Sequence, residues 1–420
     1  MPNLFQFADW ITMESLRVLV NKAQIAPFFN TTYNREFTRE FAVGETVRVK
    51  LPQRFTIRDG MGYAPQALQR LYTTVTMDQM FGVDFEWDSA EKALKMERGE
   101  DAIRREYIEP AMSQIAAELD NRCSEYAYYN TNNIVGALGT TPVTFAPYLA
   151  ARQRLNELSC PPGERGMIVS PGMETTIVGV AAVQAFHNPQ GEITRQYKEG
   201  SMGRNSGFDW YASNHLYDHT AGTWAAACTV MGVPAQGATS VLVQGTAPQT
   251  FVKGDVFTMG TAALGPVMAV NPVTRRSLGW LKQFVVTQTL TLTGGAADVL
   301  YFKPAIYGPG SPYQNVAALP TVASVLTNWP GTTTPGTGPV HGINGLALHG
   351  DAFALVGVKL ETPKAVEIAS QTRDPVTGLS VRFIRQFDAS TSKMINRFDV
   401  LCGFGDLYPD NCAVRVASLI

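Results

Sequence analysis

The sequence has 420 residues, of which 45% are hydrophobic and 17% are charged, and its formal net charge is −2. The length allows two or three domains with a sizeable core, and the apolar content excludes a disordered chain. The near-neutral charge excludes a broad nucleic-acid-binding surface, because such a surface needs an excess of Lys and Arg to displace phosphate counterions. The low charged fraction favours a protein whose surface is partly buried in contacts, although an ordinary uncharged monomer has the same composition.

The cysteines give no sign of a disulfide framework or a zinc site. Their number is odd and no two have CxxC spacing, which favours reduced thiols. We also expect no signal peptide and no membrane span, because there is neither a basic segment before an apolar one nor a stretch of about 18 apolar residues. We therefore predict no metal and no cofactor. The cysteines are Cys123, Cys160, Cys228, Cys402 and Cys412.

Residues 1–43 are predicted to form an arm. Ile11, Leu16 and Leu19 recur at helical spacing and indicate a short amphipathic helix that ends before Pro27. The following stretch mixes aromatic and polar residues without periodicity. Because the arm has no core of its own, we expect it to lie on a neighbouring molecule; packing of the helix on its own domain is the alternative. The aromatic residues proposed to make this contact are Phe28, Phe29 and Tyr33.

Residues 44–87 are predicted to form a long β-hairpin. Residues 46–51 alternate between apolar and polar, the pair Asp59 and Gly60 indicates a turn, and residues 73–86 return as a strand. A two-stranded hairpin is only marginally stable alone, so we expect it to lie along another subunit. Charged residues near its tip are predicted to pair between subunits, with solvated turn charges as the alternative. They are Arg54, Arg58, Asp59 and Arg70.

A long helix is predicted over residues 88–130. Asp88 with Glu91 resembles a capping box, and apolar residues then recur at helical spacing from Ile103 to Cys123. Pro110 should kink or break this helix. Some 40 helical residues would span roughly 60 Å, which is long for a small globular domain.

The remainder alternates between mixed and β-rich character. A helix over residues 146–158 and a buried strand over 167–169 begin an α/β part. Short strands are predicted at 240–243, 256–259, 267–270, 283–291 and 299–302, which favours an inserted β domain such as a small barrel. A Pro-, Gly- and Thr-rich stretch up to Pro339 indicates a linker, after which longer strands return.

The sequence offers little catalytic chemistry. It contains neither a GxxxxGK[ST] phosphate loop nor an HExxH motif. Ser170 resembles a nucleophile elbow, but Ile168 stands where Gly is needed and Pro171 removes a backbone N–H from the oxyanion hole. His215 and His219 have the spacing of helical metal ligands, but their flanking residues predict a loop. We therefore do not predict an enzyme.

The order of these segments resembles the major capsid proteins of tailed bacteriophages with the Johnson fold. It is most similar to the coat proteins of short-tailed phages that carry an inserted domain. No single motif is specific, residues 303–340 have no counterpart, and the shared order carries the resemblance. The matching stretches are residues 44–52, 163–171, 253–259, 270–272, 281–287, 351–355 and 397–405.

The resemblance implies an α+β fold with an extended loop, a long spine helix, peripheral and axial domains and an inserted barrel-like domain. The implied divisions are an arm (1–43), an extended loop (44–87), a peripheral domain with the spine helix (88–144), an axial domain (145–209), an inserted β domain (210–340) and a return to the axial and peripheral domains (341–420).

The same resemblance implies a shell subunit without enzymatic activity. Such proteins form hexamers and pentamers of an icosahedral head around double-stranded DNA, with scaffolding and portal proteins and sometimes a decoration protein. They assemble in the host cytoplasm and remain in the virion. The alternatives are an encapsulin-type bacterial compartment, which generally lacks a large inserted β domain, a soluble hydrolase that uses carboxylates or Ser170, and a tail or fibre protein.

Overall fold

The computed structural model shows a mixed α and β protein, which confirms the predicted class at that level. The chain divides into two compact units, each built from three separate segments. The first contains residues 1–50, 72–123 and 353–407, and the second contains the rest. The structure describes residues 3–33, 46–57, 60–62, 65–66, 72–88, 104–178, 203–223, 228–261, 265–295, 297–328, 341–364, 366–374, 377–390 and 392–418.

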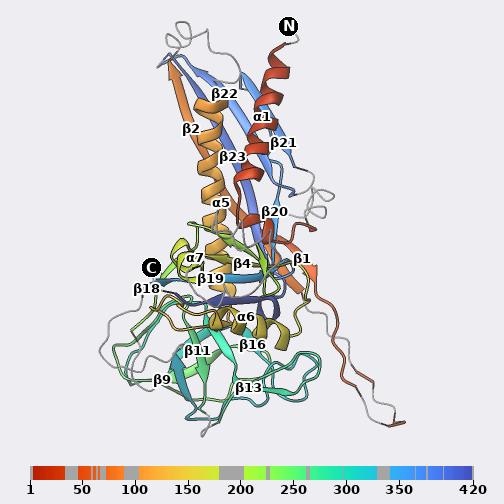
Figure 1. The fold of residues 1–420 in the computed structure, drawn as a ribbon, viewed down its shortest axis with the longest axis vertical. Helices are drawn as coiled ribbons and strands as arrows, with labels where there is room; N and C mark the ends of the chain where they lie inside the picture. The colour runs from red at the N-terminus through yellow and green to blue at the C-terminus, as the bar shows by residue number, and fades with distance from the viewer. Residues whose placement is uncertain are drawn as a thin grey trace. The chain divides into compact units, whose positions relative to one another are not determined.

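The first unit is organised around a six-stranded antiparallel sheet. Its strands lie in the order β1-β2-β23-β22-β21, and β20 pairs with β23 as well. Figure 1 shows the long strands β2, β22 and β23 running side by side, with the helices α1 and α5 along them. The elements are α1 (Asn3–Lys22), η1 (Ala26–Phe28), β1 (Thr46–Lys50), β2 (Tyr72–Asp88), the π-helical η2 (Arg104–Ile108), α5 (Glu109–Asn130), β20 (Phe353–Gly357), β21 (Ile368–Arg373), β22 (Ser380–Asp388) and β23 (Lys393–Asp406).

Helices and sheet share one apolar core. Leu19 of α1 and Met112 of α5 are fully buried against the sheet, where Phe398 of β23 is also fully buried. On β23, Asp399 alternates with Phe398 and bonds to Arg382 and Arg397 at 2.5 and 2.6 Å. Alternation of apolar and charged side chains along β23 therefore gives the sheet one face for the helices and one polar face.

The N-terminal helix packs within its own chain, so the prediction that residues 3–30 lack an intramolecular core is wrong. Ile11, Leu16 and Leu19 join the core of the sheet, and Asn30, further along the chain, forms a parallel bridge with Ala354 of β20. The alternative, a helix packed on its own domain, is what the structure shows. The rest of the predicted arm, residues 34–43, lies outside the described residues.

The hairpin prediction is partly wrong, because β2 is not confined to a two-stranded ribbon. It pairs with β1 on one side and with β23 on the other, in register from Val75 to Asp88 apart from an irregularity after Thr76. The long sequence separation between β2 and β23 hid this partner. The described residues between Lys50 and Tyr72, which are 51–57, 60–62 and 65–66, belong to no strand.

The long helix begins later than predicted. Asp88 is the last residue of β2, so it does not cap a helix, and Glu91 lies outside the described residues. The described helical stretch starts as η2 and continues as α5 from Glu109. Pro110 stands in the first turn of α5, where its missing N–H costs no helical bond. Pro110 does not interrupt the described helix, which runs from η2 directly into α5 and changes type at Glu109.

The second unit contains a six-stranded mixed sheet, in the order β3-β24-β19-β4-β6-β5. The pairs β3-β24 and β4-β6 are parallel and the others are antiparallel. Helix α6 contacts β24 and β3. The elements are β3 (Ile134–Val135), α6 (Ala146–Glu157), β4 (Arg165–Val169), α7 (Pro171–Val178), β5 (Arg204–Asn205), β6 (Phe208–Ala212), β19 (Gly345–His349), α10 (Pro409–Cys412) and β24 (Ala413–Val416).

A closed six-stranded barrel completes the second unit. Its strands run in the order β11-β14-β16-β9-β8-β17 and are β8 (Cys228–Val230), β9 (Ala238–Gln244), β11 (Val256–Met259), β14 (Gln283–Val286), β16 (Asp298–Ile306) and β17 (Val325–Asn328). Short pairs lie around them: β7 (Asp218–Thr220) with β18 (His341–Ile343), β10 (Thr250–Phe251) with β15 (Leu290–Thr291), and β12 (Met268–Val270) with β13 (Ser277–Leu281).

Aromatic residues fill the barrel. The rings of Phe257, Phe284 and Phe302 lie with centroids 5.1–6.0 Å apart, and all three side chains are buried. The strands predicted inside residues 240–302 correspond to β9, β11, β12, β14 with β15, and β16. The barrel strands begin at Cys228, whereas Trp210 belongs to β6 of the mixed sheet. Among the described residues, no helix has the length and apolarity that a membrane crossing requires.

Replacing Gly82 with alanine is expected to destabilise the first unit by about 1–3 kcal/mol, the usual cost of overpacking a core. A Cβ at this position would overlap the carbonyl oxygen of Phe398, so β2 and β23 would have to separate. Gly62→Ala is the matched control, because nothing lies within 4 Å of a Cβ there. Urea unfolding measures both; equal stability of the two variants would contradict this account.

Candidate functional site

The connection between β1 and β2 exposes apolar side chains. Phe55 is 60% exposed, Ile57 is 95% exposed and Met61 is fully exposed. Single exposed apolar residues are ordinary on protein surfaces, but here three occur within seven positions of the sequence. We call the described residues 51–57 and 60–62 the extended loop. Grouped exposed apolar side chains are typical of surfaces that contact another molecule.

A side-chain amide holds two parts of the extended loop and its return together. The Thr56 N–H donates to Oε1 of Gln66 at 2.8 Å, and Nε2 of Gln66 donates to the Thr56 carbonyl at 2.5 Å. Gln66 therefore satisfies backbone groups that a strand would otherwise pair. This contact gives the loop a defined path where Pro52 interrupts the strand pattern.

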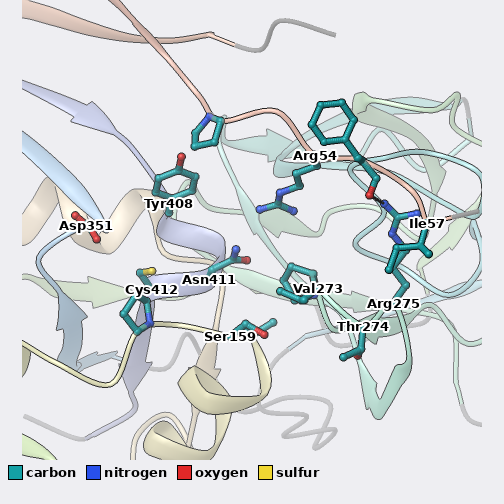
Figure 2. Close-up of a pocket in the computed structure, with 15 residues that line it drawn as sticks. Arg54, Ile57, Ser159, Val273, Thr274, Arg275, Asp351, Tyr408, Asn411 and Cys412 are labelled. Atoms are coloured by element: carbon teal, nitrogen blue, oxygen red, sulfur yellow. Dashed lines mark hydrogen bonds between the residues drawn. The ribbon is translucent and has the colours of Figure 1, made fainter. Parts of the chain in front are cut away.

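A pocket of about 680 Å³ lies beneath the extended loop, within the second unit (Figure 2). Arg275 donates from Nη2 to the carbonyls of Phe55 and Pro312, at 2.9 and 3.3 Å. Arg54 lies 6.0 Å above the ring of Tyr313. These contacts attach the base of the loop to the barrel side of the pocket. The other residues that line it are Pro52, Ile57, Leu158, Ser159, Pro161, Pro272, Val273, Thr274, Asp351, Tyr408, Asn411 and Cys412.

The structure distributes the predicted contact residues between both units. Arg54 lines the pocket of the second unit, whereas Phe28, Phe29 and Tyr33 belong to the first. Phe28 and Tyr33 are partly buried. Phe29 is 3% exposed, with its ring 5.5 Å from Phe353 and 6.2 Å from Phe404. Phe29 already has its partners in this chain, so we leave it out of the proposed contact surface.

Three predicted contact residues lie outside the described part of the chain. They are Arg58, Asp59 and Arg70. Their pairing between subunits stays a prediction.

The residues considered for catalysis have structural partners. Oγ of Ser170 accepts the N–H of Met173 at 3.3 Å and the Ser170 carbonyl accepts that of Glu174, which makes Ser170 the N-cap of α7. Nε2 of His219 lies 2.8 Å from Oδ1 of Asp255, and both side chains are buried. His219 is therefore held by Asp255 and is not presented with His215 as a metal ligand.

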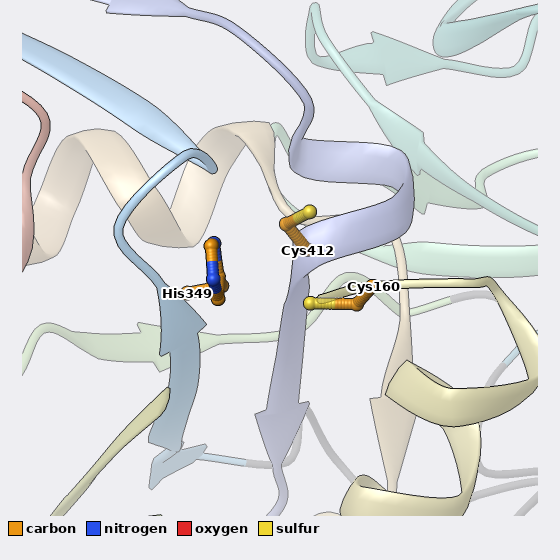
Figure 3. A group of neighbouring side chains, drawn as sticks. All are labelled: Cys160, His349 and Cys412. Atoms are coloured by element: carbon orange, nitrogen blue, oxygen red, sulfur yellow. The ribbon is translucent and has the colours of Figure 1, made fainter. Parts of the chain in front are cut away.

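Sequence reasoning missed a cluster of two cysteines and a histidine. Cys160, His349 and Cys412 come from separate parts of the chain and lie together in the second unit, all buried (Figure 3). A hydrogen bond from the Cys412 thiol lowers the pKa of Cys160, against the opposing effect of burial, and Arg165 lowers it further. The same hydrogen bond, together with burial, raises the pKa of Cys412.

The remaining thiols with perturbed pKa values are of a different kind. Burial raises the pKa of Cys228 to about 11 and that of Cys402 to about 12, and it raises the pKa of Cys123 as well. These three thiols behave as small apolar side chains. The spacing of 160, 349 and 412 in the sequence gave no signal that would have separated the cluster from them.

Solved structures are similar to this chain, but no sequence family matches it. No protein-family model matches the sequence, and no curated protein matches it. The structure is similar to one from Mycobacterium phage Che8, with 12% identity, a TM-score of 0.49 and coverage of 94% of this chain and 90% of the other.

Two further similar structures are phage capsids. The capsid of cyanophage P-SCSP1u has 11% identity and a TM-score of 0.42, with 90% of this chain and 85% of the other covered. The mature capsid of bacteriophage PhiM1 has 11% identity and a TM-score of 0.40, with 89% and 82% covered.

Proposed function

We propose that this chain is the major capsid protein of a tailed bacteriophage, a subunit that assembles with copies of itself into the head shell. The observation that carries the proposal is the extended loop, whose side chains Phe55, Ile57 and Met61 project apolar surface into solvent. Burying an apolar side chain of this size stabilises a contact by roughly 1.5–3 kcal/mol. One such contact is weak, but a closed shell repeats it in every subunit, so the sum is strong.

A second apolar surface, on the outside of the barrel, supports the same proposal. Leu242 of β9 and Val299 of β16 stand opposite each other in the strand register and are 44% and 39% exposed. Tyr301, two residues further along β16, is 42% exposed. Neighbouring cross-strand side chains of this kind form a continuous patch. Two separate apolar surfaces suit a subunit that has more than one neighbour.

The composition favours a shell that encloses nucleic acid over a protein that binds it tightly. With a net charge of −2, the chain lacks the basic excess that phosphate binding requires. We therefore propose that the shell encloses double-stranded DNA without sequence-specific contacts. By the resemblance of the sequence, the subunits form hexamers and pentamers, assemble with scaffolding and portal proteins in the host cytoplasm, remain in the virion and accept a decoration protein in some relatives.

The finer divisions of the chain belong to the same proposal. The barrel strands lie inside the proposed insertion at 210–340, between Cys228 and Asn328. The proposed inter-subunit contacts, besides the extended loop, are Phe28, Tyr33, Arg54, Arg58, Asp59 and Arg70. A hydrolase is disfavoured because Ser170 serves as a helix cap. An encapsulin-type compartment is disfavoured by the barrel, since such shells generally lack a large inserted β domain.

Electron microscopy of the purified full-length chain tests the proposal. We expect closed shells or their curved fragments, together with a large scattering mass in solution that grows with protein concentration. Hexamers or pentamers alone at low protein concentration also agree with the proposal, because weak contacts between them form only as the concentration rises. A chain that stays monomeric or dimeric over the whole concentration range, under cross-linking as well, would rule the proposal out.

A further inference from the structure

We propose that Cys160, His349 and Cys412 form a binding site for a zinc ion. One ligand atom from each of these three residues lies within 4.8 Å of the other two. The side chains are 5%, 6% and 4% exposed, so the cluster is enclosed by protein. Figure 3 shows the three side chains, which come from three separate parts of the chain. This site is independent of the proposed shell function.

The distances suit the ion. Zinc binds thiolate sulfur at about 2.3 Å and imidazole nitrogen at about 2.0 Å, so the ligand atoms of a tetrahedral site lie roughly 3.5–3.8 Å apart. The cluster reaches that spacing through side-chain movements on the order of 1 Å. Two thiolates with an imidazole are ligands of the soft and intermediate type that select zinc over magnesium or calcium.

The backbone around the cluster is fixed by the mixed sheet. His349 ends β19 and Cys412 directly precedes β24, and these strands pair with Leu348 opposite Ala413. Continuing the register by one residue places His349, the last residue of β19, opposite Cys412, the residue before β24. Two of the three ligands are thus positioned by backbone hydrogen bonds that exist without the metal.

Arg165 positions the third ligand. It lies opposite His349 in the pairing of β4 with β19, and its side chain donates to the loop that carries Cys160. Nη2 reaches the Cys160 carbonyl at 2.6 Å and Nε reaches the Pro161 carbonyl at 2.7 Å. Arg165 itself is 3% exposed. Such buried supporting bonds are what a metal site needs to hold its ligands in place.

Asp351 orients the histidine. Nδ1 of His349 accepts the N–H of Asp351 at 3.1 Å, and Oδ2 of Asp351 lies 3.6 Å from the same nitrogen. Asp351 occupies the Nδ1 side of the ring, which leaves Nε2 for the metal. Metal binding at Nε2 would place the imidazole proton on Nδ1, so the bond from the Asp351 N–H would be given up and the Asp351 carboxylate would become the acceptor, as in other carboxylate–histidine–metal arrangements.

A fourth ligand would enter from the side of the pocket. Asp351 and Cys412 both line the pocket of Figure 2, so a water molecule there would complete a tetrahedral site. Binding converts both thiols to thiolates and releases their protons to solvent. The ion would then link the loop after α6 to β19 and to α10, three segments that are far apart in the sequence.

Metal analysis of the intact protein tests this inference. The full-length chain is purified under reducing conditions from zinc-supplemented cells, and its metal content is measured by atomic emission. We expect about one zinc ion per chain, the stoichiometry of one such site. The metal-free protein should take up Co²⁺ with the intense near-ultraviolet absorption of cobalt–thiolate bonds. Chelation should lower the unfolding temperature, and added zinc should restore it.

Variants locate the ion. Cys160→Ser and Cys412→Ser are expected to abolish the cobalt–thiolate absorption or halve it, and His349→Gln is expected to weaken zinc binding at least tenfold. Cys228→Ser is the matched control, since it also alters a buried cysteine but lies in the barrel. It should retain full binding. The wild-type cobalt titration does not depend on any variant folding.

Two results would overturn the inference. One is a wild-type chain that takes up neither zinc nor Co²⁺ after reduction. The other is a mass two hydrogens lower under non-reducing conditions, with Cys160 joined to Cys412, combined with an unfolding temperature that zinc does not change. Neither result would bear on shell assembly, which is measured separately.

Discussion

Replacing Ile57 and Met61 with aspartate is expected to abolish shell formation and leave the subunit folded. These side chains are 95% and fully exposed in the single chain, so the substitutions remove no packing from its core. In a shell the same positions would be buried, and an unpaired carboxylate there costs several kcal/mol at each contact. Even 3 kcal/mol for each contact weakens it on the order of a hundredfold, since about 1.4 kcal/mol is a factor of ten. The yield of shells is counted by electron microscopy.

Conservative substitutions show whether assembly depends on the apolar character of these two positions or fails after any change there. The double variant Ile57→Val and Met61→Leu keeps both positions apolar and is expected to assemble normally. Circular dichroism and unfolding temperature should be the same for both double variants and the wild type. Normal shells from the aspartate variant would show that this part of the extended loop stays exposed in the assembly.

The sequence predicts the existence of strands in the barrel region better than it predicts what the first 90 residues pack against. Turn residues and inward aromatic or branched residues such as Phe257 and Phe284 marked the barrel strands β9, β11, β14 and β16, whereas the short strands β8 and β17 were not predicted. The pairing of β2 depends on β23, some 300 positions away, and strand alternation does not name a partner. The sequence therefore predicts that the hairpin lies along another molecule, whereas β2 pairs with β23 of the same chain.

The predicted start of the long helix is wrong for a related reason. Asp88 and Glu91 have the spacing of a capping box, but Val83, Phe85 and Trp87 continue the alternation of β2 up to Asp88. Pairing with β23 up to Lys393 decides the outcome there, since tertiary contacts override local capping preferences. The sequence pattern alone supported both interpretations.

The zinc-site residues could not be predicted, because no local spacing links them. Cys160 and Cys412 are brought together by strand pairing within the mixed sheet and by the bonds of Arg165. Motif reasoning finds metal sites whose ligands share a turn or a helix. It does not find sites that are assembled by sheet register. The exposure of Ile57 and Met61 was equally hidden, since apolar residues in a strand pattern are expected to be buried.

Replacing Asp120 with alanine is expected to release the N-terminal segment from the first unit. The carboxylate, 1% exposed on α5, accepts three backbone N–H groups after the end of α1. They belong to Gln24, Ile25 and Ala26, at 2.7, 2.9 and 3.0 Å. Alanine leaves these donors without their acceptor, and each buried donor without a partner costs about 1–3 kcal/mol. We therefore expect a loss of about 3 kcal/mol or more in the free energy of unfolding.

The readout is amide hydrogen exchange along α1 and η1, together with urea unfolding. Asp120→Asn keeps one acceptor oxygen and should fall between alanine and the wild type. Glu118→Gln is the control, because it removes a carboxylate from the same helix, where that side chain is 44% exposed beside Arg122. Exchange in residues 24–26 that is equally slow in the alanine variant and the control would show that the apolar contacts of Leu19 and its neighbours hold the segment without the carboxylate. Fast exchange confined to this segment would instead show that the Asp120 carboxylate holds it in place.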